Sequence, residues 1–287
     1  MPLLLFVSLI WAFSFGLIKG QLAGIDSTAI ATLRLALAFA VFLPFLRFTG
    51  VTLRSATRLI LVGAVQFGLM YLLYQRSYIY LPAYAVVLFT LTTPLYMAVL
   101  DAVIERRLEA RFLVAAALAL LGSAAVWFTG TPHGDLLKGF LLIQLSNICF
   151  AAGQLAWRRE RAQLDPAVSD ASLFALPYAG AAFVGAAGSL FFTDWHAVSP
   201  TFAQWGVLAY LGVISSGACF FWWNLGATRV NVGTLAVFNN AKVPLGVACS
   251  LLFFGEHANL PRLLLGGALM GLAVWIAERK PRSRSAG

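Results

Sequence analysis

Apolar runs long enough to cross a lipid bilayer recur along the whole chain, and they constrain its fold more than any motif does. A membrane-spanning helix needs about 20 predominantly apolar residues, and ten windows of that length fit the sequence. Of the 287 residues, 61% are hydrophobic and only 11% are charged, whereas a soluble domain carries about 25% charged residues. We therefore predict an all-α polytopic membrane protein with ten transmembrane helices, at 2–19, 27–46, 59–80, 83–104, 110–129, 136–157, 171–192, 203–224, 232–254 and 260–277.

The basic residues indicate how the chain is oriented. With the N-terminus placed in the cytoplasm, the inner segments hold 14 Lys and Arg residues and the outer segments hold 4. Cytoplasmic loops carry an excess of these residues, so both termini are predicted to be cytoplasmic, in a bacterial inner membrane. The net charge of +9 is then explained by topology. No nucleic-acid partner is predicted, because aromatic residues do not alternate with the basic ones as on a base-stacking surface.

Two stretches of equal length share one layout, which indicates an internal repeat. Both begin rich in aromatic residues, turn midway, and end in an apolar run closed by Pro-Leu. A glutamate follows each proline, and a further apolar window with a glycine follows each glutamate. The landmarks are Tyr71, Pro94, Glu105 and Gly122 in the first half and Phe221, Pro244, Glu256 and Gly271 in the second.

Each half then holds five windows, and because five is odd the second half enters the membrane from the opposite side. We predict two inverted five-helix repeats, at 1–130 and 136–278, followed by a basic cytoplasmic tail at 279–287. Inverted repeats are common in secondary transporters, whose substrate sites lie near the bilayer midplane between the repeats. The sequence therefore predicts one transmembrane unit with a midplane cavity.

Several short motifs resemble one transporter family. The stretch Ile10–Gly16, followed by Lys19, resembles the opening of the EamA branch of the drug/metabolite transporter (DMT) superfamily, and Leu33–Leu35 resembles its span-two arginine motif. The paired proline, glutamate and glycine landmarks resemble its two EamA repeats. Each motif is weak alone, but their order and duplication extend the resemblance over essentially the whole chain.

The resemblance implies ten helices, cytoplasmic termini, and a central cavity lined mainly by spans 1, 3, 4, 6, 8 and 9. It also implies export or exchange of small organic metabolites, such as amino acids and related carboxylate-bearing compounds, without specifying one. Lys242 departs from the family's usual apolar or small polar residue near the second-repeat proline. The resemblance therefore does not directly imply a purely aromatic or cation-binding cavity in this chain.

Lys242 lies near the middle of the ninth window. An ionisable group there costs about 2.5–3.5 kcal/mol unless it faces a cavity or a partner. If Lys242 faces the cavity, its ammonium would pair with an anionic group such as a substrate carboxylate, and Asn239, on the same helix face, would orient that group. The alternative is a structural lysine bonded to a carbonyl that Pro244 leaves without its helix hydrogen bond.

Polar and aromatic residues in four windows are candidates for the wall of the cavity. Amides that faced lipid would be unsatisfied, which favours an amphipathic wall that stacks on flat or apolar parts of a substrate. Aromatic residues near helix ends also form interfacial belts, and buried amides also bond neighbouring helices, so these alternatives stay open. The candidates are Trp11, Ser14, Tyr71, Gln75, Tyr78, Asn147, Gln154, Trp223 and Asn224.

Arg34 and the acidic residues near span ends have structural alternatives as well. Arg34 is long enough to snorkel or to pair structurally, and the other interpretation places it in the substrate path. Glu105 and Glu256 are expected to form loop salt bridges or helix caps rather than a proton relay. Pro94 and Pro244 are expected to shape the path, because proline removes one helix hydrogen bond.

No motif indicates an enzyme, a metal or a cofactor. The sequence lacks a Walker A stretch, a G-x-S-x-G elbow and an H-E-x-x-H pair. Its three cysteines lie within apolar runs and its three histidines in separate loops, so their spacing does not predict a metal site. We predict no enzymatic activity, no metal site and no cofactor.

The prediction is a secondary transporter that moves a small organic metabolite by alternating access, with lipid and the metabolite as its partners. A facilitative uniporter, or a membrane protein that transports nothing, are the alternatives. Gly267 and Gly271 form a GxxxG pair, which permits close helix approach within the bundle or in a homodimer.

Overall fold

The computed structural model describes residues 2–106, 110–127, 135–230 and 232–278. Every regular element in those ranges is helical. The α-helices are α1 (Pro2–Gln21), α2 (Ser27–Phe42), α3 (Leu53–Gly63), α4 (Met70–Ser77), α5 (Ala83–Phe89), α6 (Thr93–Ile104), α7 (Ala110–Trp127), α8 (Leu136–Gln163), α9 (Asp170–Phe192), α10 (Phe202–Ala209), α11 (Cys219–Ala227), α12 (Val232–Phe253) and α13 (Leu260–Glu278).

Eight helical stretches in the described ranges are long and apolar enough to cross a membrane, so the prediction of an all-α polytopic membrane protein is confirmed. They coincide with eight of the ten predicted windows. The fifth window holds the shorter apolar stretch Ala110–Ala125, and the ninth holds α12. The eight stretches are Leu3–Gln21, Ser27–Phe45, Leu53–Ser77, Ala83–Ile104, Leu136–Gln163, Asp170–Phe192, Phe202–Ala227 and Leu260–Ala277.

Several spans are not regular α-helices along their whole length. A π-helical segment, Ala64–Leu69, joins α3 to α4, and a second one, Tyr210–Ala218, joins α10 to α11. These are the third spans of the two predicted halves. A short 3₁₀ segment, Thr90–Thr92, separates α5 from α6 just before Pro94, and another, Leu43–Phe45, ends the second span. Such irregular segments free backbone carbonyls from the α-helical pattern.

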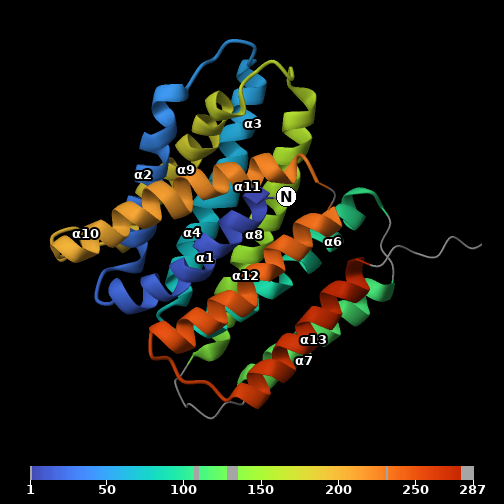
Figure 1. The fold of residues 1–287 in the computed structure, drawn as a ribbon. Helices are drawn as coiled ribbons and strands as arrows, with labels where there is room; N and C mark the ends of the chain where they lie inside the picture. The colour runs from blue at the N-terminus through green and yellow to red at the C-terminus, as the bar shows by residue number, and fades with distance from the viewer. Residues whose placement is uncertain (1, 107–109, 128–134, 231, 279–287) are drawn as a thin grey trace, which may run out of the picture.

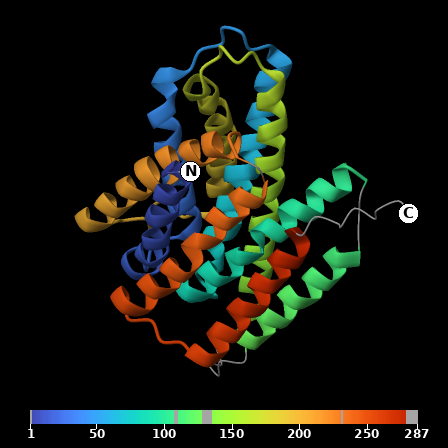
Figure 2. The same cartoon turned by 45° about the vertical axis from the view of Figure 1, so that its right-hand side comes forward.

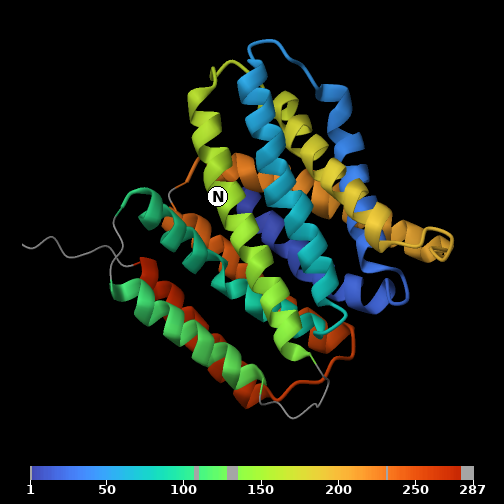
Figure 3. The ribbon, with the colours of Figure 1, turned by 180° about the vertical axis from the view of Figure 1, so that it is seen from behind.

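The helices form a main bundle with one pair of helices along its edge. Helices α2, α3, α8 and α9 run roughly together, and α1, α12 and α6 cross them obliquely (Figure 1). The pair α7 and α13 lies side by side along one edge in all three views (Figures 1, 2 and 3). Helix α1 packs on α12, and α2 packs on α9. Elements of the two sequence halves are thus interleaved.

Glycines allow the closest approaches between the halves. A Cβ atom on Gly63 in α3 would lie 1.8 Å from the carbonyl oxygen of Pro177 in α9, and one on Gly180 would lie 1.9 Å from the carbonyl oxygen of Ile60. In the edge pair, a Cβ atom on Gly122 would lie 2.7 Å from the carbonyl oxygen of Gly266. Small residues let membrane helices approach backbone to backbone, and these helices approach that closely.

The loop after α12 reaches across to the other half of the chain. Glu256 accepts hydrogen bonds from the backbone N–H groups of Ala83 (2.7 Å) and Tyr84 (2.9 Å), at the start of α5. Ser250, near the end of α12, also donates to the Glu256 carboxylate. Gly255 precedes the glutamate with a φ of 65°, a left-handed conformation that glycine adopts without steric cost. The Glu256 carboxylate therefore caps α5, a helix that is distant from it in sequence.

Candidate functional site

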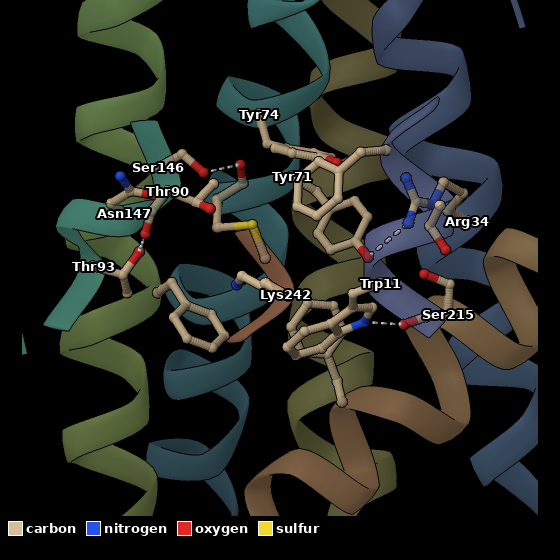
Figure 4. Close-up of a pocket in the computed structure, with 15 residues that line it drawn as sticks. Trp11, Arg34, Tyr71, Tyr74, Thr90, Thr93, Ser146, Asn147, Ser215 and Lys242 are labelled. Carbon is tan, nitrogen blue, oxygen red and sulfur yellow. Dashed lines mark hydrogen bonds between the residues drawn. The ribbon is translucent and has the colours of Figure 1, made fainter. Parts of the chain in front are cut away.

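A buried cavity of about 80 Å³ lies among α1, α2, α4, α6, α8, α11, α12 and the two irregular segments at Thr90–Thr92 and Tyr210–Ala218 (Figure 4). Five of the residues predicted to bind substrate line it. The sequence interpretation missed Phe15, Met70, Thr90, Thr93, Ser146, Phe150, Ser215 and Phe220, which also line it. Tyr74, which shares the three- and four-residue spacing of Tyr71 and Tyr78 in the third window, lines it too. The five predicted residues are Trp11, Ser14, Tyr71, Asn147 and Lys242.

Lys242 faces this cavity and is only 7% exposed. Its ammonium donates a 2.9 Å hydrogen bond to Asn239 Oδ1 and lies 5.1 Å from the centroid of the Trp11 ring. The other end of the Asn239 amide, Nδ2, is buried without a hydrogen-bond partner among the described residues. No acidic residue is among the described residues that line the cavity. Asn239 is not among the residues that line the cavity, so the Lys242 ammonium is the group of this pair that is available to an anionic ligand.

Arg34, on α2, also lines the cavity and is 2% exposed, so it does not snorkel to an interface. Its Nε donates to Ser216 Oγ at 3.1 Å, its Nη2 to the Tyr71 hydroxyl at 3.0 Å, and its Nη1 to Gln75 Oε1 at 3.5 Å. The guanidinium carbon lies 4.7 Å from the centroid of the Tyr71 ring. All of these partners are neutral.

Trp11 is anchored by the irregular segment of the eighth span. Its indole N–H donates to the carbonyl oxygen of Ser215 at 3.0 Å, within the π-helical segment, where carbonyls are released from the α-helical pattern. Its ring packs at 4.7 Å from that of Phe220 and 5.1 Å from that of Trp223, centroid to centroid. The wall of the cavity on this side is thus aromatic and held in place by a hydrogen bond.

Asn147, on α8, stabilises the irregular segment before Pro94. Its Nδ2 donates to the Phe89 carbonyl oxygen at 2.9 Å and to Thr92 Oγ1 at 3.1 Å. Thr92 in turn donates to Gln144 Oε1 at 2.7 Å. The side chain therefore lines the cavity and also satisfies a backbone group that the 3₁₀ segment leaves open. Pro94 lies in the first turn of α6, whereas Pro244 lies inside the helix α12.

Three of the predicted binding residues belong instead to a buried amide cluster. Asn224 Oδ1 accepts from Gln154 Nε2 at 3.0 Å and from Gln66 Nε2 at 3.1 Å, and the indole N–H of Trp223 donates to Gln154 Oε1 at 2.9 Å. None of these four residues is among those that line the cavity. The sequence did not point to Gln66, because its partner Asn224 lies in another span.

Two more of the predicted binding residues, Gln75 and Tyr78, line a separate and larger pocket of about 580 Å³. This pocket lies at the loop ends of α1, α2 and α4, beside the segment that joins α9 to α10. Lys19 lines it and donates to the carbonyl oxygen of Tyr78 at 2.7 Å. Gln75 is shared between the two regions, because it also accepts from Arg34.

Glu105 lies at a surface, with its carboxylate 3.9 Å from Arg159 and its side chain 50% exposed. Glu256 forms the helix cap described above. Neither residue lines the cavity. Among the described residues, no cluster of three or more His, Cys, Asp or Glu side chains could hold a metal ion.

A helical membrane protein with a largely apolar cavity that carries two cationic side chains and is lined from both halves of the sequence has the architecture of a small-molecule carrier. Comparison with known proteins identifies the group. The EamA-like transporter family matches residues 1–128 and 137–279, so the chain belongs to this family, and the resemblance inferred from its motifs is confirmed. It is a transporter and not an enzyme.

Three similar proteins have curated names. The chain is 42% identical over 277 residues to a "Probable biotin transporter" from Pseudomonas aeruginosa, with 96% of both chains covered. It is 37% identical over 289 residues to a "Biotin transporter" from Salmonella typhimurium, covering 100% of this chain and 95% of the relative. It is 36% identical over 288 residues to the "Biotin transporter" of Escherichia coli K12, covering 99% and 95%.

One solved structure, titled only as the crystal structure of a protein, matches the fold with a TM-score of 0.67 at 19% identity, over 96% of both chains. These comparisons support transport of a small metabolite. They give no support to amino acids as the cargo or to efflux as the direction.

Proposed function

We propose that this chain carries biotin, or a close carboxylate-bearing relative of it, across the bacterial inner membrane by alternating access. Three relatives that are named for biotin support this cargo. The observation that carries the proposal is the Lys242 ammonium, which faces the cavity and donates to Asn239 Oδ1. Biotin presents a single carboxylate at the end of a flexible chain, which matches that ammonium.

The rest of the cavity suits the apolar body of such a cargo. The rings of Trp11, Tyr71, Phe150 and Phe220 line it together with Met70. A bicyclic ring system stacks on surfaces of this kind, and its burial is favourable in proportion to the apolar area removed from water. The cavity volume of about 80 Å³ is below the roughly 300–1,000 Å³ typical of ligand sites. Loading therefore requires the surrounding helices to separate, as alternating access demands.

The proposed topology has ten spans in two inverted five-helix repeats, 1–130 and 136–278, with both termini cytoplasmic and the basic tail 279–287 at the inner face. The family matches, 1–128 and 137–279, support this division. The paired π-helical segments in the third span of each half support it as well. Spans 3–4 and 8–9 would move against one another around the cavity. A homodimer through Gly267 and Gly271 and the absence of a nucleic-acid partner stay predictions.

The test is transport of labelled biotin by the purified protein in liposomes, with Lys242→Met as the variant. Loss of a hydrogen bond to a charged group costs about 1.5–3 kcal/mol, or roughly a 10- to 150-fold rise in KM. Biotinamide, which lacks the carboxylate, should compete poorly with labelled biotin for transport by the wild-type protein. For the variant, biotinamide should compete as well as unlabelled biotin does. Lys138→Met is the matched control, because Lys138 is a 63% exposed cation paired with Asp135. Unchanged KM and unchanged preference for biotin over biotinamide in Lys242→Met would refute the proposal.

A facilitative uniporter is the second candidate for the mode of transport. The observation in its favour is that no carboxylate is among the described residues lining the cavity, so a side-chain proton relay has no acidic member there. Uptake with and without an imposed proton gradient separates the two modes. Counterflow from preloaded liposomes measures whether the direction is export or exchange, as the family resemblance implies, or uptake.

A further inference from the structure

The wall of the cavity carries two cations, and each cation lies against an aromatic ring. The ammonium of Lys242 on α12 lies 5.1 Å from the ring centroid of Trp11, and the guanidinium of Arg34 on α2 lies 4.7 Å from that of Tyr71. In the close-up, the Lys242 amine and Arg34 lie on opposite sides of the Trp11 and Tyr71 rings (Figure 4). A cargo that extends across these two rings therefore meets a cation on each side of them.

Arg34 has more hydrogen-bond donors than its described partners use. A guanidinium presents five N–H donors and remains charged in proteins, and three donor contacts are formed here, to Ser216, Tyr71 and Gln75. The contact to Gln75 is long, at 3.5 Å. No described acidic side chain pairs with the guanidinium. A buried charge with spare donors, in a cavity wall, is stabilised by a further oxygen acceptor.

We propose that Arg34 is a specificity-determining residue that binds a second oxygen acceptor of the cargo, at the end opposite its carboxylate. This inference rests on the proposed biotin transport, and in biotin the acceptor is the carbonyl oxygen of the cyclic urea. Arg34 donates from its planar fork to that oxygen, while Ser216 and Tyr71 hold the fork in place. Lys242 thus selects for a carboxylate, and Arg34 selects for a urea at the far end.

The orientation of Arg34 supports this assignment. Nε and Nη2 are fixed by short contacts to Ser216 and Tyr71, and the hydroxyls of those two residues also bond each other at 2.8 Å. The weakest contact is made by Nη1. Nη1 can therefore exchange Gln75 for a ligand oxygen with the smallest loss of hydrogen-bond energy. A site built to donate to one acceptor discriminates strongly against analogues that lack it.

The experiment compares two competitors for labelled biotin uptake into proteoliposomes. Lipoate has the same five-carbon acid chain as biotin and a sulfur ring, but no urea, whereas biotin has both the acid and the urea. In Arg34→Gln, the affinity for biotin should fall roughly 10- to 100-fold, whereas the affinity for lipoate should stay as in the wild-type protein. Arg34→Lys retains the charge without the fork, and it should also lose the preference for biotin over lipoate.

The readout is the ratio of the affinity for biotin to the affinity for lipoate, rather than the absolute rate. A merely structural role for Arg34 would weaken the binding of both ligands equally and leave this ratio unchanged. An equal loss for biotin and lipoate in Arg34→Gln and Arg34→Lys, or an unchanged ratio, would overturn the inference. Tighter competition by a straight-chain dicarboxylate than by biotin would overturn it too, since Arg34 would then bind a second anion. Lys138→Gln, at the exposed ion pair, is the control. Absence of biotin uptake by the wild-type protein would overturn the proposed function and, with it, the assignment of Arg34 to the urea oxygen.

Discussion

The cap that Glu256 places on α5 leads to a sharp stability prediction. The first N–H groups of a helix have no partners within the helix, and Glu256 accepts from two of them, at 2.7 Å from Ala83 and 2.9 Å from Tyr84. Replacement by alanine leaves both donors open and removes the favourable charge at the helix N-terminus. We expect Glu256→Ala to destabilise the fold and Glu256→Gln, which keeps one acceptor, to destabilise it less.

The size of the effect follows from these contacts. An N-cap interaction lost to alanine costs about 0.5–2 kcal/mol, and the lost interaction of a carboxylate with the helix dipole adds about 0.3–1 kcal/mol. Because the side chain is only half-buried, we expect about 1–3 kcal/mol in total for Glu256→Ala. Ser250, which donates to the same carboxylate, also loses its partner.

The assay is thermal unfolding of the purified protein in detergent, followed by intrinsic tryptophan fluorescence. A loss of this size should lower the melting temperature by roughly 2–10 °C, by analogy with domains of this length. Glu160→Ala is the control, because Glu160 forms an ion pair with the 48% exposed side chain of Arg58 at 3.4 Å, and such pairs contribute little. If Glu256→Ala has the same melting temperature as the wild-type protein and Glu160→Ala, the cap contributes no stability and this reasoning is wrong.

Two further predictions concern packing. Gly63→Ala places a Cβ atom 1.8 Å from the Pro177 carbonyl oxygen and should destabilise the bundle by about 3 kcal/mol. The measurement is the yield of folded protein in membranes, which should fall. Gly271→Ala, with no atom within 4 Å of its Cβ, is the control and should give the wild-type yield. Gln154→Ala removes a donor to Asn224 and should lower the free energy of unfolding by about 1–3 kcal/mol, measured by thermal unfolding. The preference for biotin over biotinamide should stay unchanged. A changed preference would place the amide cluster in the binding site.

Interactions within one helix were the ones that sequence reasoning predicted best. The spacing placed Lys242 and Asn239 on one helix face, and the structure joins them by a 2.9 Å hydrogen bond, although the role predicted for Asn239 was to orient the substrate carboxylate. Apolar windows predicted the spans for the same reason, because membrane length is a local constraint. The general rule that polar residues in apolar windows face a cavity or a partner would also have identified Thr90, Thr93 and Ser146.

Interactions between spans could not be predicted in the same way. A buried amide lines a cavity or bonds another helix with equal plausibility, and only the packing of α8 against the third and eighth spans assigns Gln154 and Asn224 to a mutual cluster. Met70 and Phe150 line the cavity, yet an apolar side chain facing a cavity has the same sequence signal as one facing lipid. The partner of Glu256 is 173 residues distant, beyond any local pattern.

The two prolines show most clearly that local sequence is insufficient. Pro94 and Pro244 occupy equivalent places in the two repeats, and each disfavours the α conformation in the residue before it. Yet the chain departs from α-helix before Pro94, at Thr90–Thr92, whereas α12 continues through Pro244. Asn147 bonds the Phe89 carbonyl that the break exposes, so tertiary contacts stabilise the break in one repeat. The same proline chemistry thus accompanies a break that a neighbouring helix stabilises in one repeat and a continuous helix in the other.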